Sequence, residues 1–268
     1  MKQVWLRIPL WGRKVIQYTL VTAFWLGIWM FAAWRLGESL LLPTPWAVIR
    51  RLGELAAEMS FWRTVGSSLW RILSGMLAAI LAGCILAVAT HFIPPLYTLF
   101  FPVITVIRST PVASIIILAY LWIGRDDIPT FISILMVLPV VWVNLHEALG
   151  ATDKDLKEMA KVFQFSPWKK LRHIYLPSVM PAFMASCRSS IGLAWKAGVA
   201  AEVLTVPALS IGKRLSDAKL YLETTDLFAW TLAVVLLSLL LELAVVSVLR
   251  LIGKRRRTHR PGQREVTA

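Results

Sequence analysis

Six long apolar stretches run through this chain of 268 residues, and they decide what it can fold into. Each is close to the ~20 residues that an α-helix needs to cross the hydrocarbon core of a bilayer. The residues are 57% hydrophobic and only 16% charged, whereas a water-soluble domain usually carries about 25% charged residues. The sequence therefore predicts an all-α polytopic membrane protein with six transmembrane helices, at residues 15–36, 64–90, 96–123, 129–145, 177–199 and 227–252.

The net charge of +14 comes largely from short basic blocks at the two ends. Such blocks beside apolar spans are typical of cytoplasmic segments under the positive-inside rule. We therefore expect a cytoplasmic N-terminal segment at 1–14, a single transmembrane domain at 15–252 and a basic cytoplasmic tail at 253–268. Nucleic-acid binding is the weaker interpretation, because no aromatic residues interleave these blocks. The first apolar run is too long for the core of a signal peptide, which indicates an uncleaved span.

The cysteines and histidines point to no redox or metal chemistry. Cys84 and Cys187 lie inside apolar runs without CxxC spacing, and the four histidines are scattered along the chain. We predict neither a disulfide framework nor a metal site.

Two segments near the N-terminal end have a distinctive pattern. After the first span, Thr44 and Pro45 form a helix start, and Val48, Leu52 and Leu55 share one face of the helix that follows. We place this amphipathic helix at the outer membrane surface. The second span is rich in small residues, which permits close approach of neighbouring helices.

The polar stretch at 147–176, between the fourth and fifth spans, is patterned as two short helices. Thr152 followed by Asp155 is similar to a capping box, and Ser166-Pro167 combines a cap with a first-turn proline. Two helices with a bend between them would form a rigid lever on the cytoplasmic side. The alternative is an amphipathic loop that lies on the inner leaflet.

The residues of this loop carry a resemblance to a known family. Glu158-Met159-Ala160, then Gln164, then Ile174-Tyr175-Leu176-Pro177 are spaced as in the EAA loop. That loop is the signature of permease subunits of binding-protein-dependent ABC importers, and the similarity extends over residues 40–250. Within the superfamily the chain is most similar to the nitrate/sulfonate/taurine group. This likeness rests on Leu42-Pro43-Thr44-Pro45-Trp46, Arg108-Ser109-Thr110-Pro111-Val112-Ala113, Leu121-Trp122-Ile123-Gly124, and Ala194-Trp195-Lys196 with Ala200-Ala201-Glu202.

The resemblance implies a type I importer permease with a MetI-like core, working as a homo- or heterodimer in a bacterial cell (inner) membrane. It also implies two cytoplasmic ATP-binding subunits and an extracytoplasmic solute-binding protein as partners. The residues that the resemblance assigns to coupling with the ATP-binding subunit are Glu158, Met159, Ala160, Phe163, Gln164, Phe165, Ser166 and Pro167. Because the chain has no G-x-x-x-x-G-K-[ST] motif, ATP and Mg are expected on the partner subunits. The chain itself is expected to bind no cofactor and to be no enzyme.

One position departs from the family pattern. Gln164 stands where the family has a glycine, which adopts a positive φ at little cost, whereas glutamine in that conformation costs roughly 1 kcal/mol. We therefore expect that the bend is made differently, or that Ser166-Pro167 supplies the break.

Ionisable residues in or near the spans are the candidates for a translocation pathway. Near the bilayer centre each costs about 2.5–3.5 kcal/mol unless it meets a partner or water. The third span is also interrupted at 108–111, and an interrupted helix can expose backbone groups to a cavity. The candidate pathway and gate residues are Arg108, Thr110, Pro111, Arg188, Trp195, Lys196 and Glu202. The excess of cations among the charged residues of the spans favours a small anionic or zwitterionic solute, such as a sulfonate, nitrate, taurine-like compound or carboxylate.

Some of these residues have a plainer interpretation. Arg71, Lys196 and Glu242 would instead extend to an interface, as long charged side chains near helix ends do. Trp195 would instead belong to the aromatic belt at a membrane surface.

Together these features predict the transmembrane subunit of an ATP-driven importer. The main alternative is an ion-coupled secondary transporter, but such proteins often have two similar halves, and no internal repeat is found here. A membrane enzyme would need a convergent His/Asp/Glu or Ser/His/Asp set near one interface. The acidic residues cluster instead in the polar loop, as pairs that stabilise a helix.

Overall fold

The computed structural model describes residues 10–38 and 40–257, and every regular element within these ranges is a helix. Most of the two predicted cytoplasmic ends lies outside the described residues. The described chain divides into two compact units, which we treat separately. One comprises the residues up to Trp62 together with Arg214–Ala233, and the other comprises Arg63–Lys213 together with the residues from Val234 onward. The single transmembrane domain at 15–252 stays a prediction.

The first unit contains α2 (Leu10–Leu36), α3 (Pro45–Ala57) and the start of α12 (Thr224–Arg257). The predicted start of α3 is confirmed: Thr44 accepts a hydrogen bond from the backbone N–H of Ala47, and Pro45 occupies the first helical turn. Arg51 on α3 donates two hydrogen bonds to Asp226 on α12, at 2.6 and 2.9 Å. These bonds raise the pKa of Arg51 above its ordinary value, so the ion pair holds these two helices together at any physiological pH.

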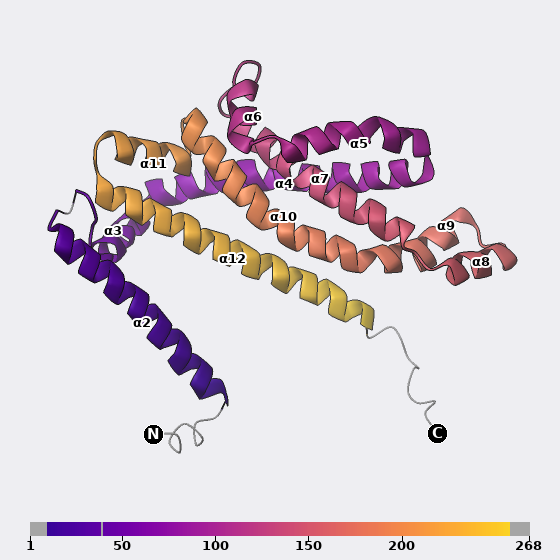
Figure 1. Cartoon of the computed structure of the whole chain (residues 1–268), viewed down its shortest axis with the longest axis horizontal. Coiled ribbons are helices and arrows are strands. Elements are labelled where there is room, and N and C mark those ends of the chain that lie inside the picture. Colours follow the sequence, from indigo (N-terminus) through magenta and orange to yellow (C-terminus); the bar gives the residue numbers. More distant parts are fainter. Residues whose placement is uncertain (1–9, 39, 258–268) are drawn as a thin grey trace. The chain divides into compact units, whose positions relative to one another are not determined.

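The second unit is the larger one and contains the loop between the fourth and fifth predicted spans. Its helices are α4 (Met59–Phe92), α5 (Pro94–Ser109), α6 (Val112–Ala119), α7 (Ile128–Gly150), α8 (Lys154–Val162), α9 (Pro167–Lys170), the π-helix η1 (Leu171–Tyr175) and α10 (Leu176–Thr205). The short helix α11 (Ile211–Leu220) begins in this unit. Figure 1 shows α7 and α10 running side by side, with α8 and α9 at one end of the pair.

Small residues bring α4 close to α7 and α10, as the composition of the second span predicts. A Cβ atom on Gly75 of α4 would lie 2.4 Å from the backbone oxygen of Thr130 on α7. A Cβ atom on Gly198 of α10 would lie 2.5 Å from the Ile72 side chain of α4. Only glycine fits at these crossings, because larger side chains would push the helices apart.

Four of the predicted spans coincide with helices that are long and apolar enough to cross a membrane: Ile16–Leu36, Met59–Phe92, Ile128–Gly150 and Thr224–Val248. The predicted interruption of the third span is also found. Helices α5 and α6 meet at an angle of 104° around Thr110 and Pro111, so they make either one broken span or a re-entrant loop. Helix α10 has the length of the remaining span but not the apolar composition, so that span stays a prediction.

Candidate functional site

The polar loop folds as the predicted pair of short helices, but its first cap is a different residue. The side chain of Asp153 accepts a hydrogen bond from the N–H of Asp155 at 2.9 Å and caps α8. The predicted cap, Thr152, is buried and donates instead to the carbonyl of Ala148, at the end of α7. Because that hydroxyl bonds back to the preceding helix, the capping position moves one residue along the chain. The predicted second cap is confirmed, since Ser166 accepts from the N–H of Lys169 at the start of α9.

The bend between α8 and α9 is made by Gln164 itself, which has a φ of 49°. The N–H of Phe165 donates to the carbonyl of Ala160 at 2.9 Å, and the N–H of Gln164 donates to that of Lys161 at 3.1 Å. These two bonds define a Schellman motif, whose left-handed residue is usually glycine. The expectation that the bend is made differently is therefore wrong. The chain accepts the cost of about 1 kcal/mol because two hydrogen bonds fix the conformation.

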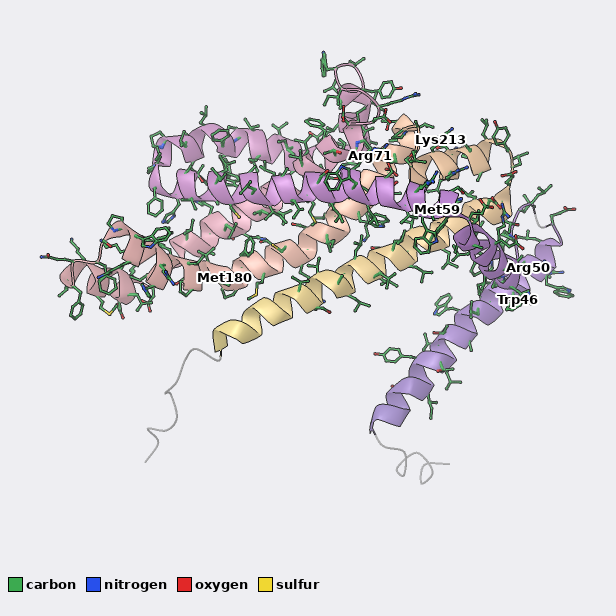
Figure 2. All side chains as sticks on the ribbon, turned by 180° about the vertical axis from the view of Figure 1, so that it is seen from behind. Trp46, Arg50, Met59, Arg71, Met180 and Lys213 are labelled. Atoms are coloured by element: carbon green, nitrogen blue, oxygen red, sulfur yellow. The ribbon has the colours of Figure 1, made fainter. Side chains whose placement is uncertain are left out.

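The predicted coupling residues differ in how they face solvent. Ala160 is fully buried and Phe165 is half-buried, while Glu158, Met159, Phe163, Gln164, Ser166 and Pro167 are exposed. Two exposed apolar residues extend this surface and were missed from the sequence. Val162 is 77% exposed and Trp168 is 67% exposed, next to Phe163 at 69%. We call Val162, Phe163 and Trp168 the coupling patch; Figure 2 draws the side chains that project from these two short helices.

The second group of predicted residues surrounds the break between α5 and α6. Arg108 lies in the last turn of α5, and Thr110 donates its hydroxyl to the carbonyl of Val106 at 2.7 Å. Pro111 precedes the first residue of α6. A cavity of about 190 Å³ lies at this break, and its wall includes Arg108, Thr110 and Leu193 of α10. The structure therefore brings the interrupted helix and α10 to one cavity.

Arg188 lies on α10, five residues before Leu193, and forms an ion pair with Glu242 of α12, with 3.3 Å between Nη2 and Oε1. Both side chains are largely exposed, at 62% and 49%. Glu242 therefore has a charged partner within the unit, and its extension to an interface stays a prediction. Lys196 is also exposed.

Trp195 and Glu202 are buried in the core of the unit. Trp195 is 1% exposed and donates its indole N–H to the carbonyl of Val234, so it does not lie in an aromatic belt. The carboxylate of Glu202 accepts hydrogen bonds from the Ser68 hydroxyl at 2.8 Å and from the N–H of Gly212 at 3.2 Å. The Glu202 side chain has no exposed surface, so in this conformation it cannot present a docking surface to a partner.

Arg71 is the cation that pairs with Glu202, while its extension to a membrane interface stays a prediction. Its Nη1 lies 3.6 Å from Oε1 of Glu202 and donates to the carbonyl of Leu209 at 2.7 Å. Its Nη2 lies 3.8 Å from Asp126. Arg71 and Lys213 are found at the same end of the unit, where α4, α10 and the loop after α10 meet (Figure 2). The sequence gives little indication that Arg71 and Glu202 pair. It shows only that a basic and an acidic residue each lie near the end of an apolar stretch.

These features define a helical membrane protein with a sharp break between α5 and α6 and two short polar helices between α7 and α10. The comparison with known proteins supplies the family. Residues 79–258 match the family described as binding-protein-dependent transport system inner membrane component, and the chain belongs to this family. The matched range contains the break between α5 and α6, the polar loop at 147–176, which we call the coupling loop after its predicted role, and α10.

Curated relatives support the same assignment and the predicted group. A putative aliphatic sulfonates transport permease of Escherichia coli (strain K12) is 29% identical over 234 residues, which cover 85% of this chain and 88% of the relative. Its counterpart in Bacillus subtilis (strain 168) is 26% identical over 129 residues, covering 48% and 46%. A bicarbonate transport system permease of Synechocystis is 30% identical over 96 residues, covering 35% and 34%. The resemblance to ABC importer permeases of the sulfonate and nitrate group is thereby confirmed.

Proposed function

We propose that this chain is the transmembrane subunit of an ATP-driven importer for a small anionic or zwitterionic solute. The observation that carries the proposal is the construction of the coupling loop. A capped helix and a hydrogen-bonded bend present the coupling patch, and α9 continues through η1 into α10 without a break. A load applied to α8 would therefore pass through the hydrogen-bonded bend to α9, and from α9 it would reach α10 through continuous helix.

The coupling patch is the surface on which we place the ATP-binding subunit. Large apolar side chains exposed together mark interaction sites, and here they lie beside the lysines of α8 and α9. Two such subunits would bind the ATP and Mg, because the sequence of this chain has no phosphate-binding loop. A second permease copy and an extracytoplasmic solute-binding protein complete the proposed complex in the cell membrane, with both ends of this chain in the cytoplasm.

The charged residues support an anionic or zwitterionic solute. A half-exposed ion pair on membrane helices is costly against lipid, so Arg188 and Glu242 would face the pathway or the second permease copy. Arg108 and Thr110 would line the pathway at the broken span, with Pro111 setting the break. Lys196 adds a cation to the exposed side of α10, while buried Trp195 and Glu202 would act as structural parts of the gate. Sulfonates and bicarbonate, named for the relatives, are both anions.

Substitutions confined to the coupling patch test whether this patch binds the ATP-binding subunit. Combining Val162→Ala with Phe163→Ala removes two exposed apolar side chains without touching the buried side of α8. We expect the affinity for the ATP-binding subunit to fall at least ~10-fold, since apolar residues at the centre of an interface carry most of its energy. The measurement is co-purification in mild detergent, quantified against the wild type.

The control is Tyr221→Ala, which removes a 70% exposed aromatic side chain between α11 and α12 and should change nothing. Equal retention of the ATP-binding subunit by the double variant and the wild type would contradict the proposed role of the patch.

A further inference from the structure

A cluster of aromatic and histidine rings begins at Tyr175, the last residue of η1. Its ring lies 5.6 Å from the ring of Phe92 and 6.2 Å from that of His91, measured between centroids, and these two residues end α4. On the side of the coupling loop, Nζ of Lys157 on α8 lies 6.0 Å from the centre of the same ring. Tyr175 thus contacts both the coupling loop and the end of a span that is distant in the chain.

The cluster continues from α4 to α7 and α5. The rings of His91 and His146 are 5.9 Å apart, and the ring of Tyr97 on α5 stacks on His146 at 4.6 Å. The hydroxyl of Thr90 lies 3.2 Å from Nδ1 of His146 and accepts a hydrogen bond from the indole N–H of Trp142 at 2.9 Å. Stacked and hydrogen-bonded rings of this kind restrain one another, because each has several neighbours.

Chain connectivity alone does not join the coupling loop to these spans. The loop follows α7 and precedes α10, so a displacement of α8 acts directly on those two helices only. Helices α4 and α5 are connected to the loop only through α6 and α7. Yet α5 leads to the broken span at Thr110 and Pro111, where Arg108 lies. Helices α7 and α10 reach the break directly, and packing between the loop and α4 adds a second, non-covalent route to it through α5.

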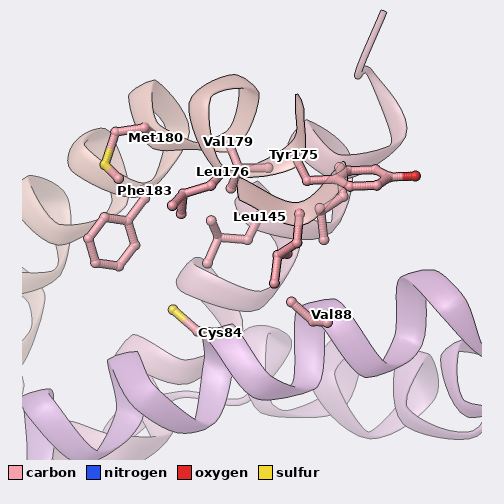
Figure 3. A pocket seen from close by; sticks show the side chains of 10 residues that line it. Cys84, Val88, Leu145, Tyr175, Leu176, Val179, Met180 and Phe183 are labelled. Atoms are coloured by element: carbon pink, nitrogen blue, oxygen red, sulfur yellow. The ribbon is translucent and has the colours of Figure 1, made fainter. Parts of the chain in front are cut away.

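Next to the coupling loop, η1 meets α4 at the ring cluster. A groove of about 230 Å³ lies between α4 and the segment formed by η1 and α10 (Figure 3). Cys84 and Val88 form its α4 side, and Val179, Met180 and Phe183 form its α10 side. Close-packed interiors transmit displacement, whereas a groove does not. The contact of Tyr175 with His91 and Phe92 lies at the end of this groove.

The π-helical conformation of η1 supports a role for this segment in movement between α9 and α10. A π-helical turn is rare, and such turns frequently lie at functional sites. Here it separates α9 from α10, so Tyr175 sits at the junction between the lever and the span.

We propose that Tyr175 is a positioning residue that carries motion of the coupling loop to α4 and then, through His91 and His146, to α5 and its broken end. This inference rests on the proposed function, since it assumes that the loop is driven by an ATP-binding subunit. It adds that Tyr175 determines how much solute is transported for each ATP hydrolysed, although Tyr175 contacts neither ATP nor the solute.

The experiment uses the complete complex with its ATP-binding subunits and solute-binding protein in proteoliposomes, with solute uptake and ATP hydrolysis measured together. We expect Tyr175→Ala to lower the solute moved per ATP about ten-fold while ATP hydrolysis stays within about two-fold, because residues that link two sites can change their coupling without contacting either ligand. Tyr175→Phe keeps the ring and should restore wild-type coupling. Tyr175→Leu, which keeps apolar volume without the ring, serves if the alanine variant fails to assemble.

The connection to α4 is tested by a double-mutant cycle with His91→Ala. If Tyr175 acts through His91, the double variant should lose little more coupling than Tyr175→Ala alone. An unchanged ratio in both the alanine and the leucine variant, or strictly additive losses in the cycle, would overturn the inference. A wild-type complex that shows no ATP-dependent uptake would instead refute the proposed function, so the two failures are distinguishable.

Discussion

At the scale of single residues, the most constrained side chain in the larger unit is Glu202. It is fully buried, it accepts bonds from Ser68 and Gly212, and its charge is matched by Arg71. Val206, four residues further on, adopts a φ of 49°, which is unfavourable for a β-branched side chain. Such a conformation persists only where the surroundings impose it. The Arg71–Glu202 pair is part of those surroundings, because Arg71 also binds the carbonyl of Leu209 in the same loop.

Removing the Glu202 carboxylate should therefore destabilise the protein strongly. In Glu202→Ala, the Arg71 guanidinium is left largely buried without its main counter-charge, and breaking such a pair costs about 3 kcal/mol or more. This corresponds to a fall of the unfolding midpoint by about 6–12 °C. Glu202→Gln keeps an acceptor for Ser68 and Gly212 and should lose less. Thermal unfolding in detergent measures both variants, and a midpoint for Glu202→Ala within about 1 °C of the wild type would exclude this account of the pair.

At the scale of elements, the larger unit depends on glycines where helices cross. Gly75 and Gly66 lie on the same helix, α4, but in opposite surroundings. A Cβ atom on Gly75 would lie 2.4 Å from a backbone oxygen of α7, whereas one on Gly66 meets nothing within 4 Å. The two positions therefore separate the effect of helix packing from that of helix propensity.

The same alanine substitution should have opposite effects at these two positions. Gly75→Ala forces α4 and α7 apart and should cost about 1–3 kcal/mol. Gly66→Ala creates no clash and should stabilise the helix by roughly 0.5–1 kcal/mol, because glycine is the more flexible residue. The unfolding midpoints of the two variants, measured side by side, test this. Similar shifts in the same direction would show that the crossing is not as close as described.

Element boundaries follow well from the sequence where a local rule decides them. Thr44-Pro45 and Ser166-Pro167 start helices as predicted, because a cap and a first-turn proline act within three residues. Thr152 shows the limit of such rules, since either it or Asp153 could cap α8 and the contact with Ala148 decides. Gln164 shows another limit, because propensity opposes the left-handed conformation that the Schellman hydrogen bonds impose.

At the scale of the whole molecule, the family match and the helical architecture agree with what the apolar stretches and the loop motif predict. The contacts between side chains that are distant in the sequence were not predictable. Arg71 and Glu202 are separated by 131 positions in the sequence, and nothing local indicates that they meet. Tyr175 and His91 likewise meet only because the helices pack as they do. The sequence names candidate residues, but their pairing is a property of the tertiary fold.

The central claim is that transport by this chain is driven by ATP bound on partner subunits. The most direct measurement is uptake of an aliphatic sulfonate into proteoliposomes that contain this chain, with and without its ATP-binding subunit, in the presence of the solute-binding protein. We predict uptake that requires ATP and the ATP-binding subunit and that is lost when Val162 and Phe163 are both replaced by alanine. Uptake by the chain alone, without ATP and driven by an ion gradient, would contradict the account and identify a secondary transporter.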